Sequence, residues 1–75
     1  MKKRVWLENI RKAKYMTHQQ VADQSGIKRQ HYSMIEAGDR RPSVETAKSV
    51  AKVLGFNWTY FFEHEGNKTR QKAVE

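Results

Sequence analysis

Two short helical patterns joined by a glycine constrain the fold of this chain more than any other feature. Thr17 can cap a helix, and Gln20 three residues later completes the capping-box pattern of a helix start. Gly26 then ends this helix, because glycine adopts the left-handed conformation of a helix stop without steric cost. A second pattern covers residues 28–37 and is closed by Gly38 in the same way. The segment therefore predicts two helices connected by a tight turn.

Two longer patterns flank this pair of helices. Residues 3–14 carry apolar side chains at helical spacing and charged side chains on the other faces. The apolar positions taken to recur at this spacing are Val5, Trp6, Ile10 and Ala13. After the pair, Ser43 can cap a helix that ends at Gly55 and has a single apolar stripe. The residues of the stripe are Ala47, Val50, Ala51 and Leu54.

An aromatic turn and a polar tail complete the chain. Asn57 is placed to cap the turn, whose aromatic side chains supply much of the mass available for a core. These side chains are Phe56, Trp58, Phe61 and Phe62. Residues 64–75 contain one aliphatic side chain larger than alanine, so this segment cannot bury enough surface to offset the entropy of ordering. We expect a compact all-α fold of five helices over residues 1–63, followed by a flexible or frayed tail.

The composition limits the classes of protein to which this chain can belong. With 75 residues it forms one domain and has little room for a separate catalytic pocket. The absence of cysteine excludes a disulfide framework and a thiolate zinc site. The basic N-terminus lacks the apolar stretch of a signal peptide, and no window approaches the roughly 20 apolar residues of a membrane span. We therefore expect a cytoplasmic protein with no membrane association.

A formal net charge of +7 favours a polyanionic partner. Nucleic acid is the first candidate and anionic lipid the second, while a third interpretation is that the basic residues only keep a small protein soluble. Lipid is the weaker of the two partners. The helix expected at 43–54 carries alanine and valine where insertion into a membrane surface needs bulky aromatic side chains.

The second helix of the pair has two chemically different sides. Tyr32 and Ile35 lie on one side, with His31 at the margin. The other side is polar, short and nearly free of acidic residues, and it comprises Arg29, Gln30, Ser33, Met34 and Ala37. Such a face fits the major groove of B-DNA, about 12 Å wide, where arginine can bond guanine and glutamine can bond adenine. The alternative is an ordinary solvated helix face.

Landmarks spread over residues 6–62 place this pair of helices in a wider pattern. They are Ile10, Arg11, Thr17, Val21, Ala22, Ser25, Gly26, Ile27, Tyr32, Ile35, Glu36, Gly38, Arg40, Pro42, Ser43, Ala51, Leu54, Gly55, Phe61 and Phe62. With these residues in register, the sequence resembles the helix-turn-helix family of phage-type repressors, the Cro and lambda-repressor-like or XRE class. The resemblance implies a five-helix domain whose second and third helices bind DNA, the third being the recognition helix.

The resemblance also implies roles for individual residues. The residues expected to read bases are Arg29, Gln30, Ser33 and Met34. The residues expected to contact phosphates are His18, Gln19, Lys28, Arg40 and Arg41. Arg11 and Glu36 resemble the family's structural ion pair, which ties the first helix to the end of the recognition helix. Trp58 and Tyr60 are candidates for a dimer interface, because this end of related proteins often forms the dimer contact.

Several basic positions leave alternatives open. Lys28 stands where the family often has a capping Ser or Thr, and a bound phosphate would satisfy both the cation and the free N–H groups of the helix start. His18 stands where glutamine is common, which suggests a pH-dependent DNA contact; the alternative is an exposed helix-start residue without a role. His31 is expected to be packed or half-exposed rather than a base reader. For residues 2–4, solvated disorder is favoured over an arm that contacts DNA.

The leading interpretation is a sequence-specific, double-stranded DNA-binding transcriptional regulator, a repressor that binds a palindromic operator as a homodimer. The alternative is a protein-binding module of the antitoxin type, in which the same fold holds a protein partner. The sequence contains no enzyme motif, and His18, His31 and His64 lie too far apart in sequence to suggest a metal site. We expect no catalytic activity, no cofactor and no small-molecule effector.

Overall fold

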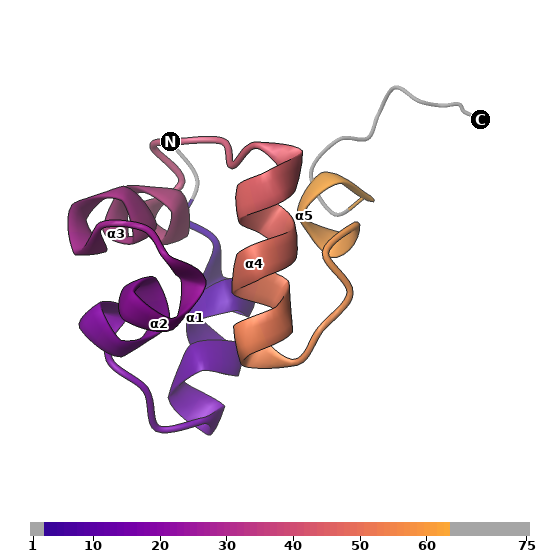
Figure 1. The fold of residues 1–75 in the computed structure, drawn as a ribbon. Helices are drawn as coiled ribbons and strands as arrows, with labels where there is room; N and C mark the ends of the chain where they lie inside the picture. Colours follow the sequence, from indigo (N-terminus) through magenta and orange to yellow (C-terminus); the bar gives the residue numbers. More distant parts are fainter. Residues whose placement is uncertain (1–2, 64–75) are drawn as a thin grey trace.

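Five helices make up residues 3–63, the part of the chain that the computed structural model describes (Figure 1). They are α1 (Val5–Ala13), α2 (His18–Ser25), α3 (Arg29–Ala37), α4 (Val44–Leu54) and α5 (Tyr60–Glu63). No strand occurs among these described residues, and the expected all-α fold of five helices is confirmed. The segment expected to form a tail, residues 64–75, lies outside them.

The ends of the central helices follow the capping residues that the sequence predicts. At the start of α2, the Thr17 hydroxyl accepts a hydrogen bond from the Gln20 N–H at 3.1 Å, and the Gln20 side chain accepts one from the Thr17 N–H at 2.8 Å. Ser43 caps α4 by accepting a hydrogen bond from the Thr46 N–H at 3.1 Å. Gly26 has a φ of 77°, in the left-handed region, and ends α2. The left-handed Gly26 thus sets the turn that leads into α3, and the two caps set the starts of α2 and α4.

α1 begins later than the apolar pattern indicates. The pattern starts at residue 3, whereas the helix starts at Val5. Arg4 lies outside the helix, and its N–H donates to the Glu36 carbonyl at the end of α3 at 2.8 Å. A bond to a distant helix end therefore sets the first residue of α1.

The buried side of α1 also differs from the prediction. Val5 is 52% exposed and Ala13 is exposed, so these two residues do not face the core. The buried residues of α1 are Leu7 and Arg11, which lie one turn apart. The predicted stripe does not include Leu7, and a pattern built from apolar residues cannot include Arg11, because Arg11 is charged.

α4 runs between the α2–α3 pair and α5 in Figure 1, and it supplies the centre of the core. Its predicted stripe is confirmed, since the four residues Ala47, Val50, Ala51 and Leu54 are all buried. The other core residues are Leu7, Val21, Ala22, Tyr32, Ile35 and Phe61. Burial of one large apolar side chain contributes about 1.5–3 kcal/mol, so this shared core holds α2 and α3 in a fixed arrangement.

An aromatic cluster attaches the C-terminal end of the domain to α1. The Trp6 ring meets three rings in edge-to-face geometry, with centroid separations of 5.4 Å to Phe56, 4.6 Å to Tyr60 and 5.2 Å to Phe61. Such pairs contribute about 0.5–1.5 kcal/mol beyond the area they bury. The short α5 is therefore stabilised by its contacts with α1 rather than by its own length.

The helices of residues 3–63 are short. The longest of them, α4, has 11 residues, and none is long and apolar enough to cross a membrane. Within the same residues, no three His, Asp or Glu side chains lie close enough together to hold a metal ion.

Candidate nucleic-acid interface

α3 has a buried inner side and a polar outer side. The inner side consists of Tyr32, Ile35 and Glu36. Arg29 and Gln30, which the sequence assigns to base reading, are exposed in the first turn of the helix. Ser33 and Met34, assigned to the same role, are half-buried further along it. The helix therefore presents its first turn to solvent and is anchored from behind.

A buried ion pair anchors α3 to α1. The Arg11 guanidinium donates to both carboxylate oxygens of Glu36, through Nε at 2.8 Å and Nη2 at 3.0 Å. The Tyr32 hydroxyl donates to the same carboxylate at 2.7 Å. Arg11 also donates to the Met16 carbonyl at 2.9 Å, which includes the α1–α2 loop in the network. Bidentate geometry fixes orientation as well as distance, so α3 is held in one orientation relative to α1.

Burial and hydrogen bonding have opposite effects on the pKa of Glu36. Burial alone would raise the pKa of Glu36, but the hydrogen bonds from Arg11 and Tyr32 and the nearby positive charges outweigh it, so the pKa lies below its ordinary value. The hydrogen bond to Glu36 raises the pKa of Arg11. Burial, with the adjacent carboxylate, raises the pKa of Tyr32. At neutral pH, Glu36 and Arg11 are charged and Tyr32 is neutral.

His18, the first residue of α2, bridges to α3. Its Nδ1 lies 2.8 Å from the Ser33 hydroxyl oxygen, and its Nε2 lies 3.2 Å from Oε2 of Glu36. The ring stands edge-on to Tyr32, with a centroid separation of 5.4 Å. Because both ring nitrogens have partners within the protein and the side chain is half-buried, His18 is more than an exposed residue at a helix start. Its contact with a phosphate stays a prediction.

An open groove runs beside the outer side of α3. It has a volume of ≈ 370 Å³ and is lined by Lys28, Gln30, His31, Met34 and Arg40. Lys28 stands at the start of α3 and makes no side-chain capping bond, as its residue type predicts. Arg40 is exposed in the loop that follows the helix. The groove therefore brings together residues that the sequence assigns to phosphates and to bases.

The two remaining residues assigned to phosphates have partners of their own. The Gln19 side-chain amide donates to Asp23 one turn along α2, at 2.8 Å. The Arg41 guanidinium lies 5.6 Å over the Phe62 ring. Both residues are exposed, but Arg41 packs against the aromatic end of the domain, whereas Arg40 lines the groove.

The sequence of the chain matches a known protein family. The family model described as "Helix-turn-helix" matches residues 7–61, most of the chain. The chain belongs to the XRE-type helix-turn-helix family. Members of this family are DNA-binding transcriptional regulators. Here α2 and α3 are the helix-turn-helix unit.

Two relatives come from Bacillus subtilis (strain 168). The HTH-type transcriptional regulator YqaF is 43% identical over 72 residues, which cover 96% of this chain and 95% of that protein. The HTH-type transcriptional regulator YqaE is 34% identical over 62 residues, which cover 83% of this chain and 53% of that protein. The similarity to YqaF therefore extends over nearly the whole of both chains.

Arg4 is a further residue of this helix-turn-helix domain that sequence reasoning misplaced. It is 7% exposed, so the disorder favoured for residues 2–4 is wrong at this position. Its guanidinium donates to the Ile35 carbonyl and, at 3.0 Å, to the Arg40 carbonyl, and it lies 5.9 Å over the Phe61 ring. Arg4 thus joins the end of α3 to the loop that carries Arg40. Free carbonyls at a helix end attract such a donor, but the sequence does not show which residue reaches them.

The aromatic end of the helix-turn-helix domain holds the two dimer candidates. Tyr60 is 38% exposed and lines an apolar groove of ≈ 440 Å³. The other residues of this groove are Trp6, Asn9, Ile10, Phe56 and Asn57. Trp58 lies outside the groove, half-buried, with the Lys48 ammonium 5.1 Å from its ring centroid. The groove is formed by α1 and residues 56–60, so it leaves the outer side of α3 free.

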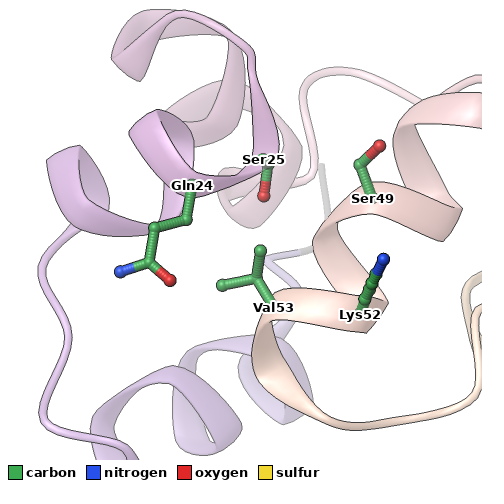
Figure 2. Close-up of a pocket in the computed structure, with 5 residues that line it drawn as sticks. All are labelled: Gln24, Ser25, Ser49, Lys52 and Val53. Atoms are coloured by element: carbon green, nitrogen blue, oxygen red, sulfur yellow. The ribbon is translucent and has the colours of Figure 1, made fainter.

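A further open pocket of ≈ 480 Å³ lies between the end of α2 and α4 (Figure 2). Its lining residues are Gln24, Ser25, Ser49, Lys52 and Val53. The Ser25 hydroxyl oxygen is buried and has no hydrogen-bond partner among the described residues. None of the residues assigned to DNA contact lines this pocket, so it is separate from the groove beside α3.

Proposed function

We propose that this chain is a sequence-specific repressor that binds double-stranded DNA at a palindromic operator as a homodimer. The observation that carries the proposal is the exposed, acid-free start of α3, which the buried pair of Arg11 and Glu36 anchors from behind. A polar helix side held in one orientation can enter the major groove with little further ordering cost. In this proposal, repression results from occupation of the operator.

Base discrimination rests on the first turn of α3. Arg29 can donate two hydrogen bonds to O6 and N7 of guanine, and Gln30 can pair with N6 and N7 of adenine. Met34, which lines the groove beside them, can contact a thymine methyl group. These three side chains are chemically distinct, so each is expected to prefer a different base edge.

Phosphate contacts position the helix and carry no base preference. Lys28 stands at the positive end of the α3 dipole, where a phosphate accepts hydrogen bonds from free N–H groups and pairs with the ammonium. Arg40 lines the same groove from the loop after α3. We assign further contacts with DNA phosphates to Gln19 and Arg41, which are exposed, and to His18.

A two-fold dimer would supply the specificity that one small domain lacks, by reading half-sites about 34 Å apart. The apolar groove lined by Tyr60 supports an interface there, because an exposed aromatic surface of this kind is a common protein contact. Asn9→Arg, at the exposed rim of this groove, should leave half-site binding intact and abolish cooperative occupation of the palindrome. Unchanged cooperativity would place the dimer contact elsewhere.

Selection of binding sites from random duplex DNA, followed by salt titration, tests the proposal. We expect a palindromic enriched sequence. Arg29→Ala should cost about 1–3 kcal/mol of binding and relax the preference at one base pair of each half-site. Arg40→Ala should weaken binding to all sequences alike and reduce the salt slope by about one. Lys52→Ala, a basic residue of the separate α2–α4 pocket, is the matched control.

Two results would count against the proposal. An absence of enrichment would contradict sequence-specific binding and favour the protein-binding module. Unchanged relative affinities of Arg29→Ala across the selected sequences would remove Arg29 from the base readers.

A further inference from the structure

The contacts of His18 determine where its protons lie. Nε2 faces Oε2 of Glu36 at 3.2 Å, and Nδ1 faces the Ser33 hydroxyl at 2.8 Å. The side chain is 34% exposed, so water does not surround the ring. Each nitrogen therefore has one defined partner, and the chemistry of the two partners differs.

Glu36 fixes the first of these protons. Arg11 bonds both of its oxygens, at 2.8 and 3.0 Å, and Tyr32 donates to one of them, so the carboxylate is ionised and can only accept. Nε2 of His18 must therefore carry a hydrogen. A neutral imidazole has a single N–H, which leaves Nδ1 as an acceptor. The Ser33 hydroxyl then donates inward to Nδ1, and only its oxygen lone pairs remain for other partners.

Protonation of the ring reverses the bond to Ser33. When His18 is charged, Nδ1 also carries a hydrogen and donates to the Ser33 oxygen. The hydroxyl hydrogen of Ser33 is then released and can rotate away from His18. Ser33 is half-buried on the outer side of α3, beside the exposed first turn. The same side chain is thus restricted to accepting in one state and able to donate in the other.

We propose that the protonation state of His18 decides whether Ser33 can donate a hydrogen bond to an acceptor on DNA, a phosphate oxygen or a base-edge atom. This inference rests on the proposed function, because it requires DNA to lie against α3. Phosphate oxygens only accept hydrogen bonds, and so do O6 and N7 of guanine. DNA binding through Ser33 therefore strengthens as the pH falls through the range in which histidine ordinarily titrates, about pH 5 to 8.

Charged and polar groups on more than one helix face the ring. Glu36 and Tyr32 face it from α3, and Arg11 of α1 lies across the Glu36 carboxylate. Glu36 attracts the imidazolium, while Arg11 and the positive end of the α2 dipole oppose it. A DNA phosphate near the start of α2 would add a second negative group on the open side of the ring.

Affinity measurements on Ser33→Ala at two pH values test the proposal. The enriched duplex is titrated with protein at pH 6 and pH 8 at constant ionic strength. We expect the affinity lost in Ser33→Ala to be about threefold to tenfold greater at pH 6 than at pH 8, because only the low-pH state can donate. When Ser33→Ala is made in the His18→Gln variant, the loss of affinity should be the same at both pH values. In the His31→Gln variant, the matched control, the loss should still be greater at pH 6. An equal loss at both pH values would overturn the proposal.

The nitrogen chemical shifts of His18 in the free protein provide a test that does not need DNA. At pH 8 we expect the tautomer with hydrogen on Nε2. The tautomer with hydrogen on Nδ1 would overturn this inference but leave the proposed function standing. An absence of DNA binding at both pH values would overturn the proposed function and this inference with it. Site selection at both pH values separates the acceptors: a changed base preference supports a base edge, and a uniform change supports a phosphate.

Discussion

The two sides of this domain are held together by different kinds of contact. On one side, α3 is tied to α1 by a buried polar network in which Arg11 and Tyr32 donate to Glu36. On the other side, α4 and α5 pack through apolar and aromatic side chains, and Leu54 and Phe61 are each 1% exposed. The helix that we propose to enter DNA is therefore anchored by a buried ion pair in addition to its apolar residues Tyr32 and Ile35, whereas α4 and α5 are anchored mainly by apolar surface.

This difference decides how each side responds to substitution. An apolar contact that is removed leaves a cavity, and its cost depends on how far the neighbours relax into it. A buried charge that loses its partner keeps its full desolvation penalty, and small relaxations do not relieve it. The polar side therefore sets the orientation of α3 more strictly and is the more sensitive of the two to the loss of one residue.

Glu36→Ala should produce the largest effect. It leaves the Arg11 guanidinium and the Tyr32 hydroxyl without their buried acceptor, and we expect a loss of about 3–5 kcal/mol in the free energy of unfolding. DNA binding should fall with it, because α3 loses its attachment to α1. Glu8→Ala is the control, since its carboxylate pairs with Lys3 and Lys12 nearer the surface, where ion pairs contribute little. A melting temperature unchanged by Glu36→Ala would contradict this account of the polar side.

Leu54→Ala tests the apolar side. Its side chain is fully enclosed by the core, so we expect a loss of about 2–5 kcal/mol in urea denaturation. The two substitutions should differ in their effect on DNA binding measured well below the melting transition. Leu54→Ala should leave the affinity nearly unchanged, whereas Glu36→Ala should lower it. A similar loss of affinity in both variants would mean that the two sides do not act separately.

The parts of the fold that sequence predicts are those set by neighbours along the chain. The caps at Thr17 and Ser43, the glycine at position 26 and the apolar stripe of α4 all depend on residues within two turns of each other. The exposure of Arg29 and Gln30 follows from the same helical period. Local rules are sufficient for these features, because the helix fixes the relative positions of nearby side chains.

The contacts that sequence does not predict join residues far apart in the chain. Arg4 reaches the Ile35 carbonyl across 31 positions, and His18 reaches Ser33 across 15. Each contact depends on how α1 or α2 is placed against α3. The helical period within one segment does not specify that placement. Arg11 shows the same limit of the helical period, since only the resemblance to the helix-turn-helix family pairs it with Glu36 before the structure is known.

Arg4→Lys should have a smaller effect than either core substitution. It preserves the positive charge but removes the planar guanidinium that bonds two carbonyls, so we expect a loss of about 1–3 kcal/mol. The loop that carries Arg40 should become more mobile, which backbone amide relaxation or hydrogen exchange would detect. Lys3→Ala, at the exposed neighbouring position, is the control. If exchange in this loop stayed at the wild-type rate, Arg4 would stabilise α3 alone.

The smallest effect that we expect is the acid dependence of stability, and it distinguishes the two sides most directly. Because the pKa of Glu36 is lower in the folded protein than its ordinary value of about 4.3, its ionised form contributes stability above that pH. This contribution is lost as the pH falls through the folded pKa. Urea denaturation between pH 5 and pH 3 should therefore show a shallower decline for Glu36→Gln than for the wild type. Leu54→Ala should run parallel to the wild type at lower stability, because its cavity does not titrate. Parallel curves for all three proteins would mean that the buried network holds α3 without contributing to the pH dependence of folding.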